Sequence, residues 1–228
     1  MKISRQVRKI LIAAVLALGL MSSASAALIQ VLGNQAVYDS GFNITWVADA
    51  NLAASNNFGV SGINANGTMT WFTAQNWIDG MNASNYLGFN DWRLPTTAQP
   101  DPSCSAQGGG VSSELNCSGS ELGHLFYTEF GVLAGNSVFT GTPADVAKFS
   151  NFQSRYWSGT TYAPTPTSAW YFDINSGLSG LQRSDPKNSN WYGLAVRSGD
   201  VSVVPLPGSI WLLGSGLLGM LGVARRRR

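Results

Sequence analysis

The sequence is short of charged residues and contains almost no histidine or cysteine. Of its 228 residues only 11% are Asp, Glu, Lys or Arg, with one histidine, His124, and two cysteines. Structural zinc sites require several Cys or His ligands, so none is expected. A serine hydrolase would have to combine His124 with Ser158, which no strand-to-helix elbow motif positions. We therefore predict a protein that is not an enzyme and has no cofactor, with calcium bound by loop oxygens as an alternative.

Two further catalytic signatures are incomplete. The three consecutive glycines at 108–110 are not followed by Lys-Ser or Lys-Thr, so they do not form a phosphate-binding loop. A glycosidase would need two carboxylates that flank the glycosidic bond, but the spacing of the acidic residues in the sequence singles out no such pair.

The first 26 residues have the pattern of a secretory signal peptide. An apolar segment, residues 10–21, follows a basic stretch, and the small side chains of Ala24 and Ala26 form a cleavage site. The basic residues are Lys2, Arg5, Arg8 and Lys9. We predict that signal peptidase cleaves after residue 26.

The last 25 residues combine a Pro-x-Pro element, an apolar run over residues 210–224 and terminal arginines. The element is Val204, Pro205, Leu206 and Pro207, and the chain ends with Arg225, Arg226, Arg227 and Arg228. As a helix the segment would span roughly 24 Å, somewhat less than a ~30 Å hydrocarbon core, with the arginines on the cytoplasmic side. We predict a transmembrane helix within residues 204–228.

This C-terminal arrangement resembles the PEP-CTERM sorting signal of Gram-negative bacteria, although Leu206 stands where that signal usually has Glu. The resemblance implies processing by an exosortase. It also implies an inner-membrane intermediate, followed by delivery to the cell surface or extracellular matrix. An ordinary C-terminal anchor is the alternative.

Removing both tails reverses the sign of the net charge. The intact chain has a formal charge of +2, but four of its fourteen basic residues lie in each tail. The body therefore keeps six basic and all twelve acidic residues, a formal charge of −6. Nucleic acid is excluded as a partner because its binding needs a basic surface.

The body, residues 27–203, has the length of one extracellular domain. Its two cysteines, Cys104 and Cys117, would reach an oxidising compartment after export, so we predict that they form a disulfide. Closing a loop of about 14 residues would stabilise the domain by on the order of 3 kcal/mol. Free thiols are the alternative.

Hydrophobic periodicity predicts short strands and two helices. Strands are expected at residues 36–38, 44–47, 155–158, 169–175 and 191–197. Residues 51–67 and 184–190 are polar and are predicted to be loops. We expect an α+β fold, loop-rich, with a mostly antiparallel sheet and two helices packed against it.

The two helices have different signals. From Thr73 to about Asn82, apolar residues recur at helical spacing, namely Ala74, Trp77, Ile78 and Met81. A second helix is predicted from a capping box formed by Ser118 and Glu121, with Gly131 at its end. Its buried stripe is expected to be Leu122, Leu125, Phe126 and Phe130.

Five short motifs follow one another through the body. They read Asp-Trp-Arg-Leu-Pro-Thr at 91–96, Glu-Leu-Gly-His-Leu at 121–125, Tyr-Trp-Ser-Gly-Thr at 156–160, Ala-Trp-Tyr-Phe-Asp at 169–173 and Gly-Leu-Ala-Val-Arg at 193–197. They resemble the successive motifs of the Lcl C-terminal domain family, a domain of largely unknown function named after a collagen-like bacterial adhesin. The resemblance covers most of residues 36–198.

This second resemblance implies an extracellular domain with a C-type-lectin-like fold and, in the adhesin, binding of sulfated polysaccharide. A body of charge −6 lacks the basic surface that sulfate groups need, so polyanion binding is not expected here.

The motif residues are interpreted as structural. They are Asp91, Trp92, Arg93, Leu94, Pro95, Thr96 and Arg197. Trp92 and Leu94 are expected in the core, Arg93 and Arg197 as ion-pair donors, and Pro95 as a residue that keeps the chain extended.

A ligand site, if present, is placed at the aromatic residues Trp191, Tyr192 and Trp157, because aromatic rings stack on sugar faces. The first hypothesis is a carbohydrate-binding, adhesin-like or lectin-like surface module. The alternative is a structural protein of the biofilm matrix without a discrete ligand site.

Overall fold

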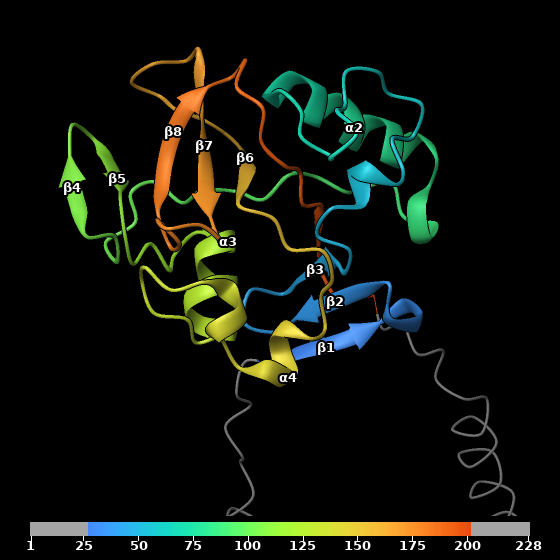
Figure 1. The fold of residues 1–228 in the computed structure, drawn as a ribbon, viewed down its shortest axis with the longest axis horizontal. Coiled ribbons are helices and arrows are strands. Elements are labelled where there is room, and N and C mark those ends of the chain that lie inside the picture. Colours follow the sequence, from blue (N-terminus) through green and yellow to red (C-terminus); the bar gives the residue numbers. More distant parts are fainter. Residues whose placement is uncertain (1–26, 202–228) are drawn as a thin grey trace, which may run out of the picture.

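Antiparallel sheets form the framework of residues 27–201, the part of the chain that the computed structural model describes (Figure 1). One sheet has four strands in the order β1-β2-β3-β9. Its strands are β1 (Leu28–Val31), β2 (Ala36–Asp39), β3 (Ile44–Val47) and β9 (Val196–Ser198). All three pairings in this sheet are antiparallel.

Two smaller sheets complete the set. A three-stranded sheet has the order β6-β7-β8, with β6 at Arg155–Thr161, β7 at Ser168–Asp173 and β8 at Gln182–Pro186. A hairpin of β4 (Ala106–Gly108) and β5 (Val111–Ser113) projects from the left of Figure 1. The α+β class with mostly antiparallel strands is therefore confirmed, but the strands form three sheets instead of the expected one.

Within residues 27–201 the helices are few and short. They are α2 (Trp71–Ala83), α3 (Glu121–Gly123), which continues as the π-helix η4 (His124–Glu129), and α4 (Pro143–Val146). Single 3₁₀ turns lie at η1 (Leu32–Asn34), η2 (Leu52–Ala54), η3 (Tyr86–Gly88) and η5 (Val138–Thr140). None of the helices within residues 27–201 is long and apolar enough to cross a membrane.

Helix α2 forms as its sequence pattern predicts. The hydroxyl of Thr70 accepts a hydrogen bond from the backbone N–H of Thr73 at 3.2 Å and caps the first turn. The four residues of the expected stripe, Ala74, Trp77, Ile78 and Met81, are all buried. The helix ends at Ala83, one residue beyond the expected position.

The second helix differs from its prediction at the N-terminus. Its N-cap is Ser120, not Ser118, and the Glu121 carboxylate binds Arg93 instead of closing a capping box. The expected stripe, Leu122, Leu125, Phe126 and Phe130, is buried as predicted. Gly131 follows the last turn with a φ of +65°, which a glycine adopts without strain.

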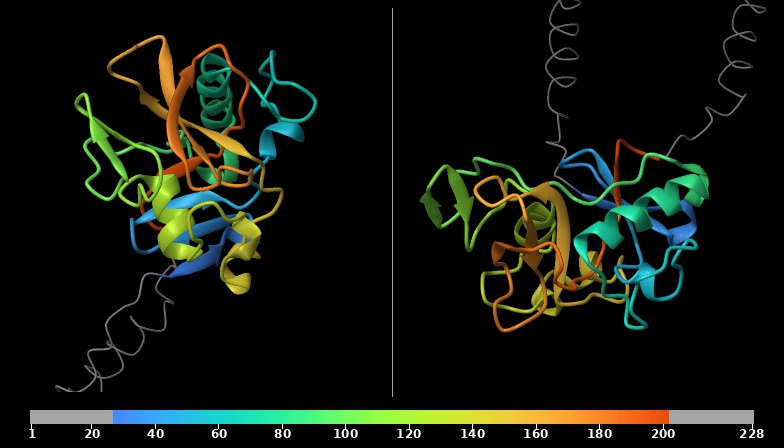
Figure 2. Two further views of the ribbon diagram at one scale, coloured as in Figure 1. Left: turned by 60° about the vertical axis from the view of Figure 1, so that its left-hand side comes forward. Right: turned by 90° about the horizontal axis from the view of Figure 1, so that it is seen from above.

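Several strands separate two hydrophobic clusters. Successive side chains of a strand point to opposite faces, and here both faces are covered. Trp46 of β3, Tyr156 of β6 and Leu194 belong to the cluster under α3 and η4, and the next residue in each case belongs to the cluster under α2. Figure 2 shows α2 and the α3–η4 helix on different sides of these strands.

Two local predictions were incomplete or wrong, and two elements were missed. Residues 184–190 are not one loop, because Gln182–Pro186 forms the edge strand β8, which is paired with β7. Of the strand expected at 191–197, only Val196–Ser198 is regular, and Trp191 and Tyr192 make isolated bridges with Met69 and Tyr156. Strand β1 and the β4–β5 hairpin were not predicted. The signal peptide at 1–26 and the sorting signal at 204–228 lie outside the described residues.

Candidate functional site

A surface pocket of about 310 Å³ opens in the loop between β3 and α2. It is lined by Ala53, Ala54, Ser55, Asn56, Asn57, Ile63, Asn64 and Ala65. None of these residues is charged and three carry amides. The volume lies near the lower limit of ~300 Å³ that is usual for small-molecule sites. In Figure 1 this loop lies beside α2 at the upper right, away from β1 at the bottom.

Asparagine side chains hold the loop in one shape. In Asn56 and Asn57 the side-chain Oδ1 accepts a hydrogen bond from the backbone N–H two residues further on, at 3.1 and 3.0 Å. Such local bonds are typical of Asx turns. The amide of Asn51 donates to the carbonyl oxygen of Asn66 at 3.1 Å and ties the start of the loop to its end. The pocket is therefore preformed.

The loop is also attached to helix α2. The indole Nε1 of Trp77 donates to the carbonyl oxygen of Asn56 at 3.0 Å. Phe58 and Ile63 pack against the hydrophobic cluster under the helix. Gly80 allows this close approach, because a Cβ at that position would lie 3.0 Å from the carbonyl oxygen of Phe58.

The amides in the pocket retain hydrogen-bonding capacity. Within residues 27–201, the side chains of Asn56 and Asn57 form hydrogen bonds only through Oδ1, and the side chain of Asn64 only through Nδ2, which donates to Thr68. Two NH₂ donors and one carbonyl acceptor therefore remain for a ligand. Ala54 and Ala65, which are exposed, supply apolar surface beside them.

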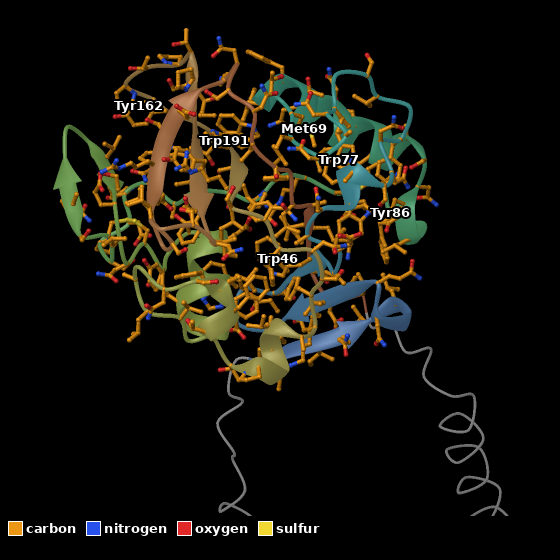
Figure 3. The ribbon with its side chains drawn as sticks, viewed as in Figure 1. Trp46, Met69, Trp77, Tyr86, Tyr162 and Trp191 are labelled. Carbon is orange, nitrogen blue, oxygen red and sulfur yellow. A yellow bond between two sulfur atoms is a disulfide. The ribbon has the colours of Figure 1, made fainter. Side chains whose placement is uncertain are left out.

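A second hollow of about 200 Å³ lies between the β4–β5 hairpin and the three-stranded sheet. It is lined by Ser113, Glu114, Tyr162, Trp170, Arg183 and Ser184, and Figure 3 shows Tyr162 at this end of the sheet. Arg183 makes two hydrogen bonds to Glu114 at 2.8 and 2.7 Å, so its charged groups already satisfy each other. We therefore regard the amide-lined pocket as the better candidate.

The extended segment 91–96 is hydrogen-bonded to several elements of the domain. The side chain of Asn82 at the end of α2 makes two 2.8 Å hydrogen bonds to the backbone of Trp92. Arg93 pairs through its backbone with Val196 of β9. The carbonyl oxygen of Pro95 accepts a hydrogen bond from Ser158 of β6 at 2.9 Å. The segment thus joins three elements that are distant in sequence.

The side chains of this segment have structural roles. Trp92 and Leu94 are each 2% exposed and belong to the cluster under α2, as predicted. Arg93 forms a bidentate ion pair with Glu121, at 2.7 and 2.6 Å. Near the chain end, Arg197 forms a bidentate pair with Asp91, at 2.7 and 2.9 Å.

A comparison with protein-family models gives a match that spans these motifs. The model of the Lcl C-terminal domain matches residues 35–197, which is more than half of the chain. The chain belongs to the Lcl C-terminal domain family. No curated protein and no solved structure matches it.

In this Lcl C-terminal domain Trp157 is excluded as a ligand-binding residue. Its side chain is 0% exposed, and its indole Nε1 donates to the carbonyl oxygen of Met69 at 3.0 Å. The expectation of a ligand contact there is therefore wrong, because strand β6 places this ring between the sheet and α2.

Trp191 and Tyr192 of the Lcl C-terminal domain do not form one aromatic surface. Trp191 packs against the cluster under α2, near Met69 in Figure 3, whereas Tyr192 packs against the other cluster. The guanidinium of Arg155 lies 4.6 Å from the Trp191 ring centroid, and the indole Nε1 donates to Asp185 at 2.8 Å. Trp191 is half-buried, so only part of its ring remains for a ligand.

The predicted disulfide between Cys104 and Cys117 is present. The two other residues considered for catalysis have separate partners. Ser158 donates to Pro95, and His124 contacts Asp39 and Glu129. The Lcl C-terminal domain therefore contains no Ser–His pair within its described residues.

Two groups of side chains have the composition of a metal site. In the first, Asp101 lies with Cys104 and Cys117, whose sulfurs are joined in the disulfide and are not thiolate ligands. The second consists of Asp39, His124 and Glu129. Sequence reasoning missed this group because its members lie up to 90 residues apart. It also missed the pocket at 53–65, for which the high density of asparagines was the one signal.

Proposed function

We propose that this protein is an exported, non-catalytic surface or matrix protein whose Lcl C-terminal domain binds neutral carbohydrate in the amide-lined pocket at residues 53–65. The observation that carries this proposal is a preformed pocket with amide and hydroxyl groups, alanine methyls and no charged side chain. Hydroxyl groups of a sugar match amide donors and acceptors, and its C–H groups match the methyls.

The charge of the domain supports a neutral ligand. With six basic and twelve acidic side chains, the body repels sulfated or other anionic polysaccharides. All six basic side chains have partners: four arginines pair with carboxylates, Lys148 pairs with Asp145, and Lys187 donates to Thr161. Within the described residues only Lys187 therefore has a positive charge without a carboxylate partner, and one such charge does not make a basic surface for a polyanion.

Export is supported by two independent features. The tails have the pattern of a signal peptide and of a PEP-CTERM sorting signal, which predicts signal peptidase and an exosortase as processing partners and a surface or matrix destination. The disulfide between Cys104 and Cys117 fits an oxidising compartment. A C-type-lectin-like fold, with a ligand bound by loops outside the sheets, is the finer structural proposal.

A structural role in the biofilm matrix is the second candidate, and the placement of the tryptophans favours it. Five of the seven tryptophans in the described residues are buried, at positions 46, 77, 92, 157 and 170. The other two, Trp71 and Trp191, each have a cationic side chain over the ring. The tryptophans of residues 27–201 therefore do not form a broad exposed surface on which a polysaccharide could stack.

A glycan array with the purified full chain tests the proposal. The array includes neutral oligosaccharides and the producing organism's exopolysaccharide, and it is run with calcium and with a chelator. We expect saturable binding to a neutral glycan. Calcium dependence of that binding would add an ion to the site.

Shape-matched variants locate the site. Asn57→Asp keeps the side-chain oxygen that accepts the hydrogen bond of the loop but replaces the NH₂ donor, so binding is expected to fall by about tenfold for a lost bond to a ligand hydroxyl. Asn188→Asp adds the same charge at an exposed position outside the pocket and should leave binding unchanged. Binding lost in Trp191→Ala but not in Asn57→Asp would move the site away from this pocket. If the folded chain binds no glycan, carbohydrate binding is contradicted and the structural role in the matrix is the candidate that is retained.

A further inference from the structure

Asp39, His124 and Glu129 meet between the end of strand β2 and the π-helix η4. The imidazole Nε2 of His124 lies 3.1 Å from Glu129 Oε1 and 3.5 Å from Asp39 Oδ1. Their side chains are 0%, 8% and 4% exposed for Asp39, His124 and Glu129. Figures 1 and 2 both place the turn after β2 against this helix.

The π-helical geometry creates this cluster. His124 and Glu129 are five residues apart, and five residues of an α-helix cover about 500°, which would place the two side chains on different faces. The wider turn of a π-helix, with i→i+5 hydrogen bonds such as that from the N–H of Phe130 to the carbonyl oxygen of Leu125 at 3.0 Å, brings them to one face. Single π turns of this kind are frequent at functional sites.

One carboxylate oxygen in the cluster has no partner. Oδ1 of Asp39 accepts hydrogen bonds from the backbone N–H groups of Gly41 and Phe42, at 2.9 and 3.2 Å. Oδ2 of the same carboxylate is buried and has no hydrogen-bond donor among the described residues. A buried, unsatisfied carboxylate oxygen is costly, and a bound cation beside it would remove that cost.

The charges favour a cation of charge two. With a neutral imidazole the cluster carries two negative charges, and a protonated imidazole still leaves one. Only a divalent ion makes the site neutral with all three groups in their ligand forms.

We propose that Asp39, His124 and Glu129 form a binding site for a divalent first-row transition-metal ion of the zinc type. A tetrahedral ion with ligand bonds near 2.0–2.1 Å places its ligand atoms about 3.3 Å apart, close to the 3.5 and 3.1 Å from His124 Nε2 to the two carboxylates. Ligand atoms of all three side chains lie within 4.8 Å of one another. One imidazole nitrogen with two carboxylates suits such an ion better than calcium, which prefers oxygen ligands only.

The surroundings hold the ligands in place. The ring of Phe42 stacks on the imidazole of His124, with centroids 3.8 Å apart and planes inclined by 17°. The two backbone N–H groups that bind Oδ1 fix the Asp39 carboxylate. Supporting contacts of this type orient metal ligands. The bound ion would join the β2–β3 turn to the α3–η4 helix.

The single histidine makes the test direct. Zn²⁺ is titrated into the ¹⁵N-labelled full chain, without a polyhistidine tag, and the imidazole nitrogens are observed by NMR. We expect one saturating shift of the His124 Nε2 resonance at one Zn²⁺ per chain, together with a higher melting temperature that a chelator reverses. Calcium at millimolar concentration should produce neither change. An unshifted Nε2 resonance in the wild-type chain would overturn the proposal, whatever the variants do.

Variants then assign the ligands by calorimetry. Glu129→Gln and His124→Gln are each expected to weaken Zn²⁺ binding by at least about tenfold. Asp173→Asn is the matched control, since Asp173 is also 0% exposed with one unpartnered carboxylate oxygen, but its other oxygen binds Arg155 and not a histidine. It should leave Zn²⁺ affinity unchanged. Equal affinity in the wild type and in folded Glu129→Gln, or equal loss in Asp173→Asn, would contradict the proposed ligand set.

Discussion

The guanidinium of Arg93 holds both carboxylate oxygens of Glu121, at 2.7 and 2.6 Å, across 28 residues of sequence. The same carboxylate accepts the backbone N–H of Thr96 at 2.7 Å. Because Glu121 is the first residue of helix α3, this contact fixes the helix to the extended segment 91–96. A residue expected to cap its own helix thus serves as the attachment point for a distant one.

Replacing Glu121 by Gln removes the charged partner of Arg93 and should destabilise the domain by about 1–3 kcal/mol. The loss is not larger because the Arg93 side chain is 32% exposed and regains part of its hydration. The free energy of unfolding is measured by urea denaturation. Glu114→Gln is the control, since its bidentate pair with Arg183 is far more exposed, at 34% and 51%, and should contribute only about 0–1 kcal/mol. Equal losses in both variants would contradict the role of Glu121 as an attachment point.

Reduction of the disulfide between Cys104 and Cys117 should lower the melting temperature. The bond closes a loop with a sequence separation of 13, worth about 3 kcal/mol in the chain-entropy model. For a domain of this size that corresponds to roughly 6–12 °C. Thermal unfolding is recorded with and without dithiothreitol, and a Cys104→Ser/Cys117→Ser variant should not respond to the reagent. Two titratable thiols in the untreated folded protein would show that the bond is absent.

Substituting Gly67 by Ala should deform the loop that carries the pocket. Gly67 has a φ of +90°, and a Cβ there would overlap Oδ1 of Asn51. Gly88 has a similar φ of +85° with nothing within 4 Å, so Gly88→Ala measures the conformational cost alone, about 1–2 kcal/mol. We expect Gly67→Ala to cost about 1–3 kcal/mol more, from overpacking. Similar stabilities of the two variants would show that the loop yields easily.

Acid should remove the contribution of the Asp91–Arg197 pair. The hydrogen bond from Arg197 lowers the pKa of Asp91 below its ordinary 3.8, so the stabilisation is present above that value and is lost as pH falls through the folded-state pKa. The Asp91 side chain is 49% exposed, so the effect is only about 0–1 kcal/mol. Wild type and Asp91→Asn should differ in unfolding free energy at pH 6, and the difference should shrink as the pH falls below 3.8. A difference that grows on acidification has the wrong sign for this pair.

The sequence was sufficient to predict a helix or strand where the pattern that defines the element lies within the element itself. The apolar spacing from Ala74 to Met81 defines helix α2, because a helix needs only a stripe that can be buried. Strands β2 and β3 were likewise found from short apolar runs bounded by a turn. The cysteines were paired correctly because the sequence contains only two of them and its N-terminal pattern predicts export to an oxidising compartment.

The sequence was insufficient where the structure of a segment depends on the element that it pairs with or packs against. Strand β8 has a polar sequence, and only its pairing with β7 makes it a strand. Trp157 and Trp191 have similar local signals, yet one is buried and the other half-buried, since burial depends on which element covers them. The amide pocket and the Asp39–His124 contact depend on turns and on a π-helix that periodicity does not reveal.

The central claim is that the asparagines of the loop at 53–65 bind neutral carbohydrate. The most direct test is an NMR titration of the ¹⁵N-labelled chain with neutral oligosaccharides, observing the side-chain NH₂ groups of Asn56, Asn57 and Asn64. We expect these signals to shift together and to saturate, while that of Asn188 stays constant. Saturable binding that shifts other residues and leaves these three amides unchanged would contradict the claim.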